Sequence, residues 1–81
     1  MSYRFHYTRH GAARKALREL NADSVDAVVR APDRKTRLRS GTHGGIVFAF
    51  EKTVNHATLK VVAEIYREEC WIITAYELDQ E

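Results

Sequence analysis

The chain has 81 residues, of which 44% are hydrophobic and 30% charged, and its formal net charge is +2. This length suits a single domain, residues 1–81, and the composition is that of a folded globular protein, which excludes a disordered chain. The longest apolar run, residues 46–50, is too short to span a bilayer, and no signal peptide is visible. We therefore expect a cytoplasmic protein with no membrane association.

Charge is distributed unevenly along the chain. Residues 1–43 contain ten Lys and Arg and four Asp and Glu, a charge of +6, whereas residues 44–81 carry −4. A basic half favours an anionic partner, either a nucleic acid or an acidic protein. Two oppositely charged halves that pack against each other would show the same pattern.

The N-terminal part is predicted to contain one strand and two helices. Aromatic and polar residues alternate over residues 3–7, which is typical of a strand. A first helix is expected over residues 9–19 and a second over residues 21–30, with Pro32 ending the second.

The remainder of the chain alternates with a period of two residues and predicts four strands. They are expected at residues 35–39, 46–50, 58–66 and 70–78. Within 58–66, one face is expected to carry Leu59, Val61, Ala63 and Ile65, and the other Lys60, Val62, Glu64 and Tyr66. The turns between them are short, and short connections imply antiparallel pairing. We therefore predict an α+β fold, in which two N-terminal helices pack on one face of a curved antiparallel sheet of four to five strands.

The first predicted helix carries groups that suit a phosphate. His10, Arg14 and Arg18 are four residues apart and would lie along one face of a helix. An imidazole can transfer protons near neutral pH, and a guanidinium can hold a phosphate through two hydrogen bonds. A solvated basic helix face would contain the same residues.

Two of the predicted strands also carry candidate residues. Lys35, Arg37 and Arg39 alternate and would contact phosphates along one strand face, although such charges also protect exposed edge strands from aggregation. Thr74 and Tyr76 share one face of the last strand by parity, and both have hydroxyls that can bind phosphate or donate a proton. Both are also ordinary strand-forming residues.

The residues that commonly bind metals show no recognisable spacing. His6 and His10 are four apart, but a strand-to-helix junction separates them. Cys70 and the turn residues His43 and His56 have no ligand-like spacing. Cys70 is the only cysteine, so no internal disulfide can form and a reducing compartment is expected. We expect no metal and no cofactor.

Several short motifs occur in a fixed order along the chain. They are Thr8, His10, Arg14, Arg18, Leu20, Pro32 with Asp33, and the segment 72–76, Ile-Ile-Thr-Ala-Tyr. This pattern resembles a family of small bacterial and phage domains of unknown function with a Ser/Thr-x-His-Ala-x-x-Arg motif. That family is related to the RelE-like toxins, compact α+β ribonucleases of the barnase-like and EndoU-like group. The chain departs from the pattern at Gly11, where alanine is usual, and at Glu19, where glycine is usual.

The resemblance implies a metal-independent ribonuclease toxin of a toxin–antitoxin system, which cleaves RNA by general acid/base catalysis. His10 would be the base or acid, Arg14 would stabilise the charged phosphate, Thr74 would bind phosphate, and Tyr76 would donate a proton or stack on a base. The residues expected to bind substrate are Arg9, Arg18, Lys35, Arg37 and Arg39. RNA, in association with the ribosome, and an acidic antitoxin are the implied partners.

A second hypothesis is a non-enzymatic binding module of the same fold, such as a phage protein that engages a host protein or a nucleic acid. A nuclease requires His10, Arg14, Thr74 and Tyr76 to converge in one groove. In a binding module these residues would be dispersed or held by internal hydrogen bonds.

Overall fold

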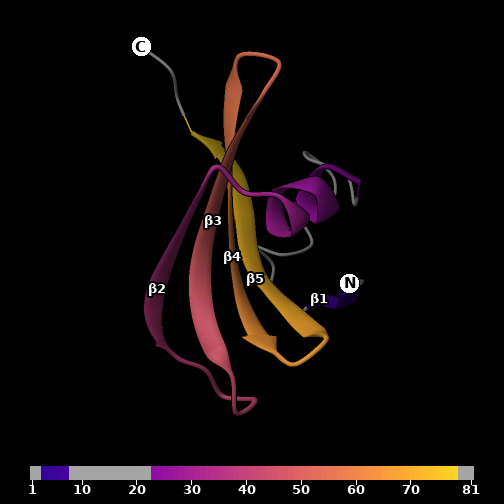
Figure 1. The fold of residues 1–81 in the computed structure, drawn as a ribbon, viewed down its shortest axis with the longest axis vertical. Helices are drawn as coiled ribbons and strands as arrows, with labels where there is room; N and C mark the ends of the chain where they lie inside the picture. Colours follow the sequence, from indigo (N-terminus) through magenta and orange to yellow (C-terminus); the bar gives the residue numbers. More distant parts are fainter. Residues whose placement is uncertain (1–2, 8–22, 79–81) are drawn as a thin grey trace.

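The computed structural model describes residues 3–7 and 23–78. Within them lie a helix over residues 23–30 and five strands, β1 (Arg4–Tyr7), β2 (Arg34–Ser40), β3 (Ile46–Val54), β4 (Ala57–Tyr66) and β5 (Glu69–Leu78). The strands form one sheet in the order β1-β5-β4-β3-β2 (Figure 1). In these described segments, no helix has the length and apolar character needed to cross a bilayer.

The strands β2 to β5 pair in antiparallel fashion, as the short turns predict. The β3–β4 turn consists of Asn55 and His56, with φ angles of 50° and 69°. Two successive positive φ angles match the twist of a two-residue hairpin. Arg67, with φ 55°, is in the β4–β5 turn. The predicted antiparallel pairing of residues 58–66 with 70–78 is therefore confirmed.

Strand β1 pairs with β5 in parallel, which makes the sheet mixed. The predicted fold class is therefore wrong: the described part is mostly β, with one short helix, and not two helices on an antiparallel sheet. A short loop forces neighbouring strands to run antiparallel, but the long segment between β1 and β2 imposes no direction on β1. The first predicted helix, residues 9–19, lies outside the described residues.

The core lies between the helix and one face of the sheet. Its buried members are Val25, Val28 and Val29 from the helix and Phe50, Leu59, Val61, Ala63, Cys70, Ile72 and Ala75 from the strands. The predicted alternation in β4, with Leu59, Val61 and Ala63 facing inward, is confirmed. Burial, with a smaller contribution from Asp26, raises the pKa of the Cys70 thiol to about 12, so Cys70 is a neutral core residue.

The other face of the sheet, which we call the far face, is turned away from the helix and carries polar side chains together with apolar ones such as Val47 and Ala49. Residues paired across strands share a face, and successive residues alternate between faces. Trp71 and Glu64 are paired, and both lie next to residues that face the core, so both belong to the far face. The same rule assigns the other strand residues to one face or the other.

Candidate functional site

Rows of paired residues cross the far face from β1 or β5 toward β2. Starting at the β4–β5 turn they are Arg4/Glu69/Tyr66, His6/Trp71/Glu64/Val47/Arg39, Thr74/Val62/Ala49/Thr36 and Tyr76/Lys60/Glu51/Arg34. Two bulges, one between Arg37 and Arg39 and one next to Val62, shift the register and so decide which residues of β2 and β5 fall into each row. His6, Glu64 and Glu69 lie in the first two rows, at the end of the sheet where the β2–β3 loop and the β4–β5 turn lie (Figure 1).

Glu64 is the only buried charged residue in the described part of the chain, with 2% of its surface exposed. Its Oε2 accepts the backbone N–H groups of His43 at 2.8 Å and Gly45 at 2.9 Å. Burial by itself would raise the pKa of this carboxyl, but those bonds and the His43 imidazole hold it below its usual value. Glu64 therefore stays ionised and holds the β2–β3 loop against the sheet.

His43 is fixed by two contacts. Its Nδ1 lies 3.0 Å from Glu64 Oε1, and its ring stacks on Trp71 with the centroids 4.2 Å apart and the planes 6° apart. The Thr42 hydroxyl lies 3.4 Å from the same nitrogen. A neutral imidazole that donates its Nδ1 proton to Glu64 keeps Nε2 as an acceptor. The side chain is 42% exposed, so solvent and ligands can reach it.

A second imidazole approaches Trp71 from the β1 side. His6 stacks on the indole with the centroids 5.3 Å apart, and its Nε2 lies 3.3 Å from Glu69 Oε2. The same Glu69 oxygen accepts from Arg4 Nε at 3.0 Å. The histidine–tryptophan cluster, which we define as His6, His43, Glu64, Glu69 and Trp71, is thus continuous from β1 to the β2–β3 loop.

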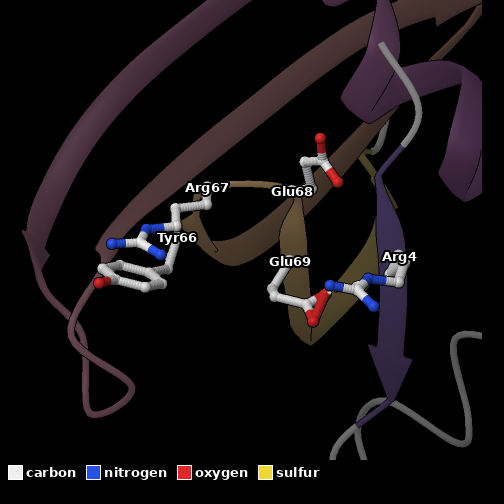
Figure 2. Close-up of a pocket in the computed structure, with 5 residues that line it drawn as sticks. All are labelled: Arg4, Tyr66, Arg67, Glu68 and Glu69. Atoms are coloured by element: carbon white, nitrogen blue, oxygen red, sulfur yellow. Dashed lines mark ion pairs between the residues drawn. The ribbon is translucent and has the colours of Figure 1, made fainter.

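A surface pocket of about 360 Å³ adjoins this cluster and is lined by Arg4, Tyr66, Arg67, Glu68 and Glu69 (Figure 2). Figure 2 shows the Arg4–Glu69 ion pair on one side and the side chains of Tyr66 and Arg67 on the other. The Arg67 guanidinium lies 5.2 Å from the Tyr66 ring centroid. Two guanidinium groups therefore line the pocket, and one of them, that of Arg4, lies in the row next to Trp71.

The predicted site residues are only partly described. Thr74 and Tyr76 lie on the far face, as parity predicted, and Tyr76 is paired with Lys60. Thr74 is one row from the histidine–tryptophan cluster, and Tyr76 is two rows away, about 13 Å at the rise of a strand. The other predicted site residues, which lie outside the described part, are Arg9, His10, Arg14 and Arg18.

The basic strand does not present a single basic face. Lys35 is paired with Phe50 and lies over the Phe48 ring at 4.2 Å from its centroid, on the helix side of the sheet. Arg37, paired with Phe48, lies on that side too. The bulge at Leu38 then brings Arg39 opposite Val47, on the far face. The prediction of one face was wrong because a sequence does not show where a bulge interrupts the alternation.

Sequence reasoning missed the residues that the fold brings together most closely. His43 was assigned to a turn, and Glu64 was placed by parity on the strand face opposite to Leu59 and Val61, without a role in the site. Their contact joins positions 21 apart, which local periodicity does not report. One local signal was present: Gly41, Gly44 and Gly45 flank His43, and glycines mark close approaches of the backbone. An added Cβ at Gly41 would overlap the Glu64 carboxyl.

Across residues 3–7 and 23–78, no three His, Cys, Asp or Glu side chains come together as metal ligands would. The cluster pairs each imidazole with one carboxylate and stacks both on an indole, which suits proton transfer and aromatic contact. No protein-family model matches the chain, and neither does any curated protein or solved structure.

Proposed function

We propose that this protein is a cytoplasmic endoribonuclease of the toxin type, which cleaves single-stranded RNA by acid–base catalysis without a metal ion. The observation that carries the proposal is the far face itself. It combines two imidazoles, His6 and His43, with the hydroxyls of Thr74 and Tyr76 on one side of the sheet. These are groups that exchange protons with, or donate to, a phosphodiester.

Cations and aromatic rings on the same face support RNA as the substrate. Arg39 lies in the row that contains His6, Lys60 is paired with Tyr76, and Arg4 lies in the row next to that of His6. Lysine and arginine bind the phosphates of a nucleic acid, and aromatic or imidazole rings stack on unpaired bases. The 2′-hydroxyl of RNA supplies the nucleophile, so DNA of the same sequence is expected to be inert.

The test is the incubation of purified protein with 5′-labelled single-stranded RNA in EDTA, alone and with ribosomes. We expect slow cleavage that leaves 2′,3′-cyclic phosphate ends, with the matched DNA intact. His56→Asn is the control variant, because His56 lies in the β3–β4 turn at the other end of the sheet and asparagine tolerates its positive φ. Intact RNA under both conditions would contradict the proposal.

A binding module is the second candidate, and two observations favour it. One nitrogen of each imidazole is already bonded to a carboxylate, as expected for internally held residues. In addition, every residue of the edge strand β2 is exposed, including Arg34, Lys35, Arg37 and Arg39. A basic edge of this kind suits an acidic protein partner such as an antitoxin. Tight association with such a partner and no RNA cleavage would favour this function.

A further inference from the structure

The position of Glu64 is energetically unusual. A carboxylate that is 2% exposed loses most of its hydration, and Val47, its cross-strand partner on β3, is apolar and buried. Three hydrogen bonds compensate for this loss, and all three reach the β2–β3 loop, at His43 and Gly45. An apolar residue would fill the same space without needing partners. The carboxylate therefore fixes the position of this loop and of His43.

The two contacts of His43 leave little freedom to its ring. Stacking on Trp71 at 4.2 Å fixes the plane of the imidazole, and the bond from Nδ1 to Glu64 fixes its rotation within that plane. In an imidazole Nε2 lies across the ring from the Cβ attachment and away from Nδ1. The residue is partly exposed, and no described hydrogen bond engages Nε2. A carboxylate that orients an imidazole in this way also selects the tautomer whose other nitrogen accepts a proton.

We infer that His43 is the general base of this protein and that Glu64 is its positioning residue, an assignment that rests on the proposed ribonuclease function. In the reaction, Nε2 of His43 takes the proton of the RNA 2′-hydroxyl. The 2′-oxygen forms a bond to phosphorus, and the bond from phosphorus to the 5′-oxygen breaks. The 5′-oxygen leaves with the electron pair and takes a proton from solvent, which gives a 2′,3′-cyclic phosphate and a 5′-hydroxyl.

The surroundings of His43 fit this role. Thr74 lies one row away on the far face, where its hydroxyl can contact the same phosphate. The guanidinium groups of Arg4 and Arg67 line the pocket on the opposite side of the Trp71 row. An RNA strand that crosses the rows would therefore pass from the pocket over His43 toward Thr74.

The test compares the rates of RNA cleavage by wild-type protein, His43→Ala and Glu64→Gln, with His56→Asn as the control. His43→Ala is expected to cleave roughly 10²–10⁴ times more slowly, the range for loss of a general base. It keeps the backbone N–H that Glu64 accepts, so the loop anchor is retained. Added imidazole should restore part of the rate of His43→Ala, a rescue that a purely structural histidine would not show.

The positioning role of Glu64 has its own measurement. In ¹⁵N NMR spectra, neutral His43 of the wild-type protein should be protonated at Nδ1, and Glu64→Gln should lose this preference together with activity. An inactive wild-type protein would refute the proposed function and this assignment with it. If the wild-type protein is active, the assignment alone fails when His43→Ala retains the wild-type rate, when imidazole gives no rescue, or when wild-type His43 shows no Nδ1 preference.

Discussion

Glu64 is a buried, charged residue that holds the β2–β3 loop in place. Its carboxylate is buried beneath the β2–β3 loop and accepts bonds from the loop backbone and from the His43 ring. Hydrogen bonds to a charged group contribute more than neutral ones, and an unsatisfied buried partner is costly. The stability of the folded protein should therefore depend on the ionisation of this one side chain.

Replacement of Glu64 by glutamine should reveal this dependence. Because the folded-state pKa of Glu64 lies below its ordinary value of 4.5, its contribution is complete above about pH 4.5 and is lost as the pH falls through the folded-state pKa. We expect Glu64→Gln to lower the free energy of unfolding at pH 7 by about 1.5–3 kcal/mol. The difference from wild type should shrink at pH 3.

Urea unfolding at pH 7, 5 and 3 measures this effect. Glu77→Gln is the matched control, because Glu77 is exposed on β5 and its loss should change stability little at any pH. An identical loss at pH 3 and pH 7 for Glu64→Gln would show that the carboxylate charge is not the cause.

The strands themselves could be predicted well from the sequence, because alternation is a local signal. All five described strands overlap predicted ones, and the two faces of β4 were assigned correctly. The bulges could not be predicted, since the extra residue in β2 or β5 leaves no mark in the alternation of side chains. Thr74 and Tyr76 lie on the same side of the β5 bulge and share a face as expected, whereas the β2 bulge separates Arg37 from Arg39 and puts them on opposite faces.

The β2–β3 loop gives a second prediction, at the level of one element. A Cβ at Gly45 would overlap the carbonyl oxygen of Ile65, which belongs to the β3–β4 pairing and cannot move away easily. Gly44 has φ +87°, but a Cβ there would meet only the Tyr66 ring at 3.8 Å, an ordinary contact. We expect Gly44→Ala to cost about 1–2 kcal/mol and Gly45→Ala about 3 kcal/mol or more.

Thermal or urea unfolding of Gly44→Ala and Gly45→Ala measures how much stability each variant loses. Equal losses would mean that backbone conformation, and not the close approach of β3 to β4, is what requires glycine here. Because the loop carries His43, the Gly45 variant should also change the imidazole signals of His43 in NMR spectra, whereas those of His56 should stay unchanged.

At the scale of the molecule, the position of β1 could not be inferred from the sequence. Hairpin turns dictate the order of β2 to β5, but nothing local states that β1 lies beside β5 and parallel to it. This placement brings His6 beside Trp71 and Arg4 beside Glu69. The cluster therefore depends on a long-range pairing, and the sequence alone could indicate only its separate parts.

The two faces of the sheet lead to a prediction about RNA binding. Arg39 shares the far face with the cluster, while Arg37 lies on the helix side, one bulge away on the same strand. Arg39→Gln should weaken binding of a 2′-O-methyl RNA and lower the dependence of log affinity on log salt by about one. Arg37→Gln should leave that slope close to wild type. Fluorescence polarisation over a range of salt concentrations measures both, and equal effects would argue against binding on the far face.

Bound RNA can be located most directly by means of Trp71, the single tryptophan of the chain. Wild-type protein is titrated with a 2′-O-methyl RNA, which lacks the free 2′-hydroxyl required for cleavage, while the indole N–H and histidine signals are followed by NMR. If RNA binds on the far face, the signals of Trp71, His6 and His43 should shift saturably, and those of His56 should stay unchanged. Saturable binding that leaves Trp71 and both imidazoles unshifted would contradict the claim that the far face is where this protein binds RNA.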